Sequence, residues 1–208
     1  MKISKHLHSC LLIEEADKTV LIDPGLFTAQ DKGLDVQALS KLDYLLITHE
    51  HPDHFHIPLI KEILAKFPET KIISNRSIVA LLQKEGIMAL SDPDENIELA
   101  DEPHEELWDV KAPENSIFTV FHRLTDPGDS HHFIHTEEIL ALPITAPWGG
   151  TTAAVELALN LKPKVIIPVH DWFWKDEFRE SMYDRLRTFF QTQDIDFKSP
   201  KTGEVFEV

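Results

Sequence analysis

The sequence predicts an α/β fold in which two mixed β-sheets form a sandwich with helices outside. Short apolar segments dominate the start of the chain, and later strands alternate with segments whose apolar residues have helical spacing, a pattern typical of sheets covered by helices. The 208 residues contain 7 glycines and 13 prolines, with no repeat or low-complexity tract. We therefore expect a single domain over residues 1–208.

The N-terminal part is expected to contain strands at 3–7, 10–15 and 19–22, with a hairpin turn at 16–18. A further apolar strand is expected at 43–47.

Helix signals follow that strand. Pro58 is typical of the first position of a helix, and Phe67-Pro68 would end that helix. Asn75, after a strand at 71–74, is a plausible N-cap for a helix over 77–84.

The rest of the chain alternates between the two element types. Strands are expected at 87–90, 97–100, 116–125, 139–143 and 165–169, and helices at 151–161 and 177–190.

The segment 48–54, Thr-His-Glu-His-Pro-Asp-His, places three histidines and an aspartate directly after a predicted strand. Imidazole and carboxylate are ligands that zinc and similar cations prefer. His49 and His51 alternate, so an extended backbone points them the same way, and the proline after them forces a turn. The segment therefore predicts one metal bound by His49 and His51 and a second bound by Asp53 and His54.

This segment resembles the His-x-His-x-Asp-His signature of metallo-β-lactamase-fold hydrolases. Other motifs occur in a similar order, at 8–10, 20–25, 127–130 and 165–170. Together they resemble the branch that includes the ascorbate-phosphate lactonase-like proteins. The resemblance implies a four-layer αββα sandwich of two mixed β-sheets flanked by helices. It also implies two divalent metal ions, zinc first, with manganese or iron as alternatives.

Two further ligands are expected at the carboxyl ends of strands, where α/β sheets usually place their sites. Asp129 follows the tight turn Pro127-Gly128, and the resemblance implies that it bridges both metals. His170 comes directly after the strand 165–169 and would complete the second site.

The third histidine of the first site has two candidates, His104 and His122. The resemblance favours His104, which lies in an acidic loop before Ala112-Pro113-Glu114-Asn115. His122 is closer to Asp129 than the family spacing implies, and we expect it to be a surface residue of a strand.

Several other residues are expected around the ligands. Asp23 is the natural acceptor for the N–H of a metal-bound histidine, and Thr48 could assist it. His8 and His131 are expected near the pocket. Trp148, together with the aromatic rings of segment 172–174, either forms an apolar wall for a substrate or fills the seam between sheet and helix.

These expectations predict a metal-dependent hydrolase. Two metals sharing a water would supply hydroxide, held by Asp53 as the catalytic residue, to cleave a small ester, lactone or phosphoester. An iron-dependent oxidoreductase of the persulfide dioxygenase kind on the same fold is one alternative. A non-catalytic metal-binding protein is another.

The composition restricts the partners. With 20 Lys and Arg against 36 Asp and Glu, the formal charge of −16 argues against nucleic acid and favours a small-molecule substrate. The N-terminus lacks the apolar core of a signal peptide, and no run of about 18 apolar residues occurs. We expect a cytoplasmic protein that does not bind membranes. The single cysteine, Cys10, is expected in the core, and a homo-oligomer remains open.

Overall fold

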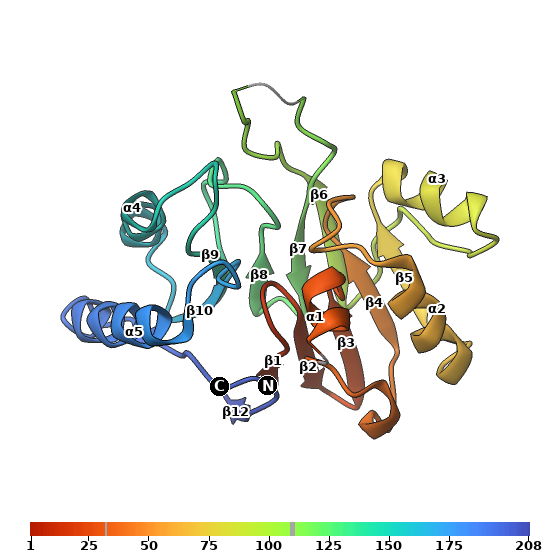
Figure 1. Ribbon diagram of the computed structural model, residues 1–208, viewed down its shortest axis with the longest axis horizontal. Helices are drawn as coiled ribbons and strands as arrows, with labels where there is room; N and C mark the ends of the chain where they lie inside the picture. Colours follow the sequence, from red (N-terminus) through yellow and green to blue (C-terminus); the bar gives the residue numbers. More distant parts are fainter. Residues whose placement is uncertain (32, 109–110) are drawn as a thin grey trace. The chain divides into compact units, whose positions relative to one another are not determined.

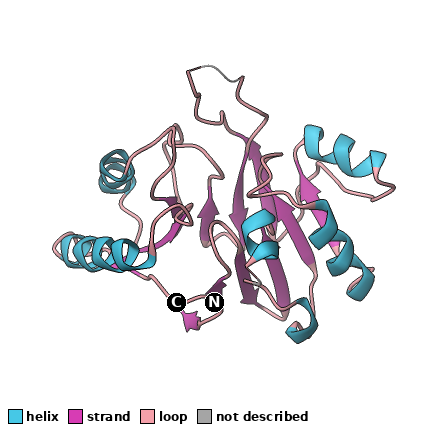
Figure 2. Cartoon of the chain, in the orientation of Figure 1, coloured by secondary structure: helices cyan, strands magenta, loops and turns pink. Residues whose placement is uncertain are grey.

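The computed structural model describes residues 1–31, 33–108 and 111–208, which divide into two compact units. The first unit comprises Met1–Pro93 and Pro200–Val208, and the second comprises Asp94–Ser199. Each unit contains one six-stranded mixed sheet with its own helices (Figures 1 and 2). The predicted α/β class with two mixed, helix-flanked sheets is therefore confirmed, whereas the single domain over 1–208 stays a prediction.

The sheet of the first unit has the strand order β12-β1-β2-β3-β4-β5. Its strands are β1 (Lys2–Lys5), β2 (Leu11–Glu15), β3 (Lys18–Ile22), β4 (Tyr44–Ile47), β5 (Lys71–Ser74) and β12 (Val205–Glu207). Ala16 and Asp17 join β2 to β3 with φ values of 48° and 62°, which suits the twist of a two-residue hairpin. The strands β3, β4 and β5 run parallel, so their carboxyl ends meet at one edge.

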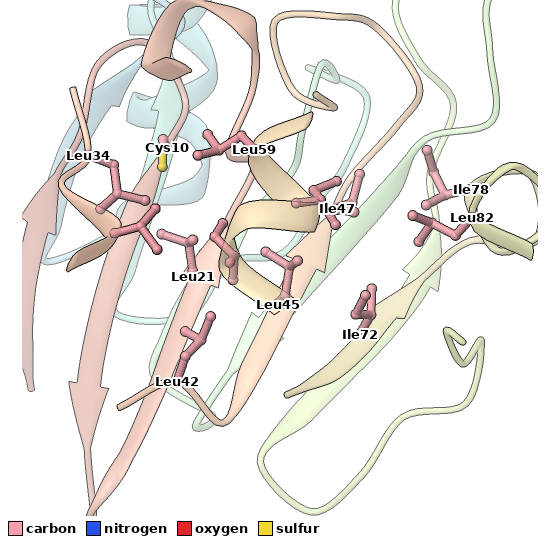
Figure 3. Packing of buried hydrophobic residues seen from close by; sticks show 13 residues of the cluster. Cys10, Leu21, Leu34, Leu42, Leu45, Ile47, Leu59, Ile72, Ile78 and Leu82 are labelled. Carbon is pink, nitrogen blue, oxygen red and sulfur yellow. The ribbon is translucent and has the colours of Figure 1, made fainter. Parts of the chain in front are cut away.

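The helices of the first unit are α1 (Leu26–Gln30), the 3₁₀ turn η1 (Val36–Ala38), α2 (Ile57–Lys66) and α3 (Arg76–Lys84). Figure 3 shows apolar side chains of β3, β4 and β5 beside those of α2 and α3. Burial of one such leucine or isoleucine contributes about 1.5–3 kcal/mol. The core includes Cys10, Leu21, Leu45, Ile47, Leu59, Ile60, Ile63, Ile72, Ile78 and Leu82, so Cys10 lies in the core as predicted.

The second unit has the strand order β11-β10-β9-β8-β7-β6. Its strands are β6 (Ile97–Asp101), β7 (Ser116–Val120), β8 (Leu124–Asp126), β9 (Ile139–Pro143), β10 (Val165–Val169) and β11 (Asp196–Phe197), and its helices are α4 (Thr151–Leu161) and α5 (Asp176–Gln191). Both helices pack on apolar residues of β9 and β10. Phe190 of α5 stacks on Phe197 of β11, with ring centroids 5.7 Å apart.

One expected strand is interrupted and one was wrong. The segment 116–125 is mostly strand, as expected, but Phe121 and His122 take left-handed φ values of 54° and 52° and reverse the chain between β7 and β8. In 87–90, only Leu90 forms a bridge, to Ile73 of β5. The short elements α1, β11 and β12 were not predicted, since two to five residues are too few to show a period.

No helix within the described ranges is long and apolar enough to cross a membrane.

Asn75 connects the end of β4 to the start of α3. Its Oδ1 accepts a hydrogen bond from the backbone N–H of Ile78 at 3.0 Å, which confirms the predicted N-cap, and its Nδ2 donates to the carbonyl oxygen of Thr48 at 2.9 Å. We predict that Asn75→Ala lowers the free energy of unfolding in urea by about 1–3 kcal/mol. Asn75→Ser keeps a capping oxygen and should lose less; equal losses in both variants would contradict the role of the cap.

Gly25 lies where the chain after β3 meets the loop after β4. A Cβ at Gly25 would be 1.7 Å from the backbone oxygen of Asp53 and 2.6 Å from the nitrogen of His54. We predict that Gly25→Ala lowers the free energy of unfolding by more than about 2 kcal/mol, because backbone must move. The matched control is Gly150→Ala at the N-cap of α4, where a Cβ meets nothing within 4 Å. Similar urea midpoints for the two variants would refute the close approach.

Candidate metal centre

In the first unit, the loop after β4 carries the predicted histidine segment. Thr48, His49 and His54 are fully buried. The backbone N–H of His54 donates to the carbonyl oxygen of His51 at 3.0 Å, so the loop turns at Pro52 as the sequence predicts. The turn brings Asp53 and His54 back toward the end of the strand.

Asp23 is a buried carboxylate that accepts three hydrogen bonds. The backbone N–H of Thr48 donates to Oδ1 at 2.8 Å, and the Thr48 hydroxyl donates to Oδ2 at 2.7 Å. His54 Nδ1 lies 2.6 Å from the same Oδ2, so Nδ1 carries the proton. Nε2 of His54 is then the nitrogen that can bind a metal.

His49 is oriented through Thr48. The Thr48 hydroxyl gives its proton to Asp23, so it accepts from Nδ1 of His49, 2.9 Å away. Nε2 of His49 lies 3.2 Å from Nδ1 of His51. Nitrogens that share a tetrahedral zinc at about 2.0–2.1 Å lie about 3.3 Å apart, so this pair has a suitable spacing.

His8 lies beside the other ligand pair of the first unit. Its Nε2 is 3.1 Å from Oδ2 of Asp53, and its ring meets those of Phe27 and His54 edge-on at 5.2 and 5.6 Å. One ligand atom from each of His8, Asp53 and His54 falls within a 4.8 Å cluster that could hold a metal ion. His8 is almost fully buried, so it contacts a predicted ligand directly.

In the second unit, the predicted ligands gather around the carboxylate of Asp129. Its Oδ2 lies 3.5 Å from Nε2 of His104 and 3.2 Å from Nε2 of His170. The indole Nε1 of Trp148 donates to the same oxygen at 3.1 Å. All three predicted ligands are buried.

The two histidines have the same tautomer. Nδ1 of His104 donates to the carbonyl oxygen of Glu105 at 2.5 Å, and Nδ1 of His170 donates to that of Thr145 at 2.7 Å. The other nitrogen of each ring, Nε2, lies beside a carboxylate oxygen of Asp129. A divalent cation placed between these nitrogens and the carboxylate would be attracted by both, so the donor set fits a metal such as zinc, manganese or iron.

Asn115 holds the turn that carries Asp129. Its Oδ1 accepts from the backbone N–H of Asp129 at 3.2 Å, and its Nδ2 donates to the carbonyl oxygen of Pro127 at 3.0 Å. Gly128 takes a φ of 57° in this turn. Asn115 could not be predicted as a supporting residue, because no local pattern shows that the start of β7 lies beside this turn.

His131 is anchored close to these ligands. Its Nε2 donates to the carbonyl oxygen of Pro143 at 3.0 Å, and its ring meets Trp148 edge-on at 5.1 Å. Burial lowers the pKa of His131, so the ring is neutral at pH 7. The side chain of Glu105, which the sequence analysis did not single out, accepts from the backbone N–H of His131 at 2.8 Å.

The structure separates the two candidates for the third histidine. His122 lies in the turn between β7 and β8, at the end of β8 away from Asp129, and its side chain is 65% exposed beside Glu98. His104 lies next to Asp129. The structure thus brings His104, and not His122, to the predicted bridging aspartate.

The comparisons with known proteins agree with this chemistry. A family model described as Beta-lactamase superfamily domain matches residues 2–170. Protein Rv0786c of Mycobacterium tuberculosis is 28% identical over 89% of this chain and 91% of its own length. A UPF0173 protein of Pyrococcus furiosus is 26% identical over 100% of both chains. A UPF0173 metal-dependent hydrolase of Nanoarchaeum equitans is 25% identical over 84% of this chain and 85% of its own length.

Solved structures share the fold. The structure of Igni18, a metallo hydrolase of Ignicoccus hospitalis, matches with a TM-score of 0.69 and 19% identity over 100% of this chain and 98% of that chain. The metallo-β-lactamase fold protein YhfI of Bacillus subtilis matches with a TM-score of 0.67 and 16% identity over 100% of this chain and 99% of that chain. Because the family model spans most of the sequence and these structures share its fold, the chain belongs to the β-lactamase superfamily and has the metallo-β-lactamase fold.

Proposed function

We propose that the protein is a metal-dependent hydrolase that cleaves a small ester, lactone or phosphoester. In this proposal the predicted ligands hold two divalent metal ions. The first metal is assigned to His49, His51 and His104, and the second to Asp53, His54 and His170. Asp129 is assigned to both.

The observation that carries the proposal is the shared tautomer of four histidines. His49 and His54 have Nδ1 fixed by Thr48 and Asp23, and His104 and His170 have Nδ1 fixed by backbone carbonyls. Each therefore offers Nε2 as a ligand atom. Outer hydrogen bonds of this kind orient metal-binding histidines and raise their basicity, whereas a histidine on a solvated loop has no need of them.

Two divalent cations, when bound, would lower the pKa of a shared water and stabilise negative charge on the substrate. Asp53 would ligate a metal and accept a hydrogen bond from the attacking water. His8 donates to Oδ2 of Asp53 and so fixes the direction of that carboxylate. Trp148 does the same for Asp129.

Cys10 is unsuited to act as a nucleophile, so thiol chemistry does not compete with an activated water. Its side chain is fully buried in the core of the first unit, and burial raises the pKa of the thiol far above its usual range. Thiol chemistry requires the thiolate. The name of the Nanoarchaeum relative, a metal-dependent hydrolase, supports hydrolysis, and the charge of −16 favours a neutral or weakly charged substrate.

Elemental analysis of protein purified without chelator tests the proposal. We expect about two zinc or manganese ions per chain. His49→Ala in the first unit and His170→Ala in the second should each lose at least one metal together with hydrolysis of generic esters, lactones and phosphodiesters. Asp53→Ala should also lose turnover.

The matched control is His122→Ala, which removes an exposed histidine of the second unit. This variant should keep its metals and its activity. A single iron with oxygen consumption would replace the hydrolase by the oxidoreductase alternative, and full metal content in His170→Ala would show that His170 is not a ligand.

A second prediction concerns Asp23. We expect Asp23→Asn to weaken zinc binding about 10- to 100-fold in chelator competition, because the neutral amide no longer holds His54 in the ligating tautomer. Asp43→Asn is the control. Like Asp23, Asp43 accepts a backbone hydrogen bond, in this case from Thr19, but its other partners are Lys18 and Lys41 and not a histidine. Equal zinc affinity in the Asp23 variant and the wild type would contradict the assigned role.

A further inference from the structure

We propose that three aromatic residues of the second unit, Trp148, Trp172 and Phe173, bind a neutral apolar group of the substrate, an alkyl chain or an aryl ring. We call these residues the aromatic cluster. This inference rests on the proposed function, because it places the apolar group beside ligands assigned to the metal centre.

The rings of the cluster lie close to two of the predicted ligands, His170 and Asp129. The ring centroids of Trp148 and His170 are 5.6 Å apart. Those of Phe173 and His170 are 5.9 Å apart, and the two ring planes are tilted by 40°. Trp172 meets Phe173 edge-on at 5.8 Å. Through its indole N–H, Trp148 also contacts Asp129. A substrate group on these rings would therefore lie next to the assigned ligands.

A neighbouring ring, that of Trp174, belongs to the core and not to the cluster. Trp174 packs against the apolar core of the second unit and meets Phe178 and Tyr183 edge-on. Phe173 is absent from that core as far as the described residues show, and it is 52% exposed. Trp174 therefore fills the seam between sheet and helix. For Phe173 we infer the other expectation, an apolar wall for a substrate.

Hydrogen bonds from α5 hold the backbone of the segment that carries Trp172 and Phe173. Arg179 of α5 donates to the carbonyl oxygens of Asp171, Trp172 and Trp174, at 3.2, 3.4 and 2.8 Å. The hydroxyl of Tyr183 donates to the carboxylate of Asp171. An exposed ring on such a fixed backbone loses little conformational entropy when it binds a ligand.

The charges beside the cluster disfavour an anionic group. Asp176, Glu177 and Glu180 lie exposed at the start of α5. Arg179 pairs with Asp176 at 2.8 Å and with Asp171 at 3.5 Å, so its charge is already balanced. We therefore infer an acyl or aryl substituent and not a phosphorylated one.

Kinetics with two esters of different chain length test this inference. We expect the zinc-loaded protein to show a lower KM for p-nitrophenyl hexanoate than for p-nitrophenyl acetate. Phe173→Ala should raise the KM for the hexanoate about 10-fold, through lost apolar contact, and should raise the KM for the acetate much less. The matched control, Phe178→Ala, removes a ring of α5 that is 53% exposed and should change neither KM.

Binding of octanoate, compared with acetate, gives a readout that does not depend on turnover. Calorimetry should show tighter binding of octanoate to the wild type and to Phe178→Ala than to Phe173→Ala. Ester hydrolysis with no chain-length preference, unaltered by Phe173→Ala, would overturn the inference and leave the hydrolase standing. Octanoate binding that depends on Phe173, with no ester cleaved, would support the cluster while the proposed function fails.

Discussion

The buried carboxylate of Asp23 is the constraint on which the first unit's site depends. A carboxylate removed from water is costly unless hydrogen bonds replace its hydration, and Thr48 and His54 supply them. These bonds join the carboxyl ends of the parallel strands β3 and β4, so one group links the two strand ends and sets the tautomer of His54. Through the Thr48 hydroxyl the same constraint extends to His49.

The second unit reaches the same result with different groups. Backbone carbonyls fix the tautomers of His104 and His170, and Asn115 fixes the turn that carries Asp129.

Left-handed backbone conformations occur at site residues of both units, with φ of 52° at His8, 47° at Asp23 and 61° at His170. Such conformations are unfavourable for residues with a side chain and persist where surrounding contacts hold them. Together with the hydrogen bonds, they indicate that both units keep their ligand residues in fixed positions.

Much of the fold followed from local patterns, because the strands and helices that carry the core have clear apolar periods. Asn75 and Pro58 marked helix starts through the chemistry of their own side chains. The turn at 121–123 could not be located within the segment 116–125, since these three positions contain no Gly, Pro, Asn or Asp to mark it. The strands β11 and β12 exist through pairing with β10 and β1, which no local pattern contains.

The ligand-type residues could be predicted because histidine and aspartate reveal their chemistry wherever they occur. Asp23 and Thr48 were predicted as supports, but Asn115, Glu105 and Arg179 could not be. Only the folded backbone brings these three residues to the turn of Asp129, the N–H of His131 and the segment after His170. The choice between His104 and His122 was open for the same reason, since it depends on which end of β8 each residue reaches.

The central claim is the proposal that the predicted histidine and aspartate ligands bind metal ions. Anomalous diffraction at the zinc absorption edge, from crystals of protein purified with zinc, tests it most directly. The account predicts strong anomalous peaks in contact with Nε2 of His49 and His54 and with the carboxylate of Asp129. Peaks only at exposed histidines such as His122, or at the ligands of one unit alone, would contradict it.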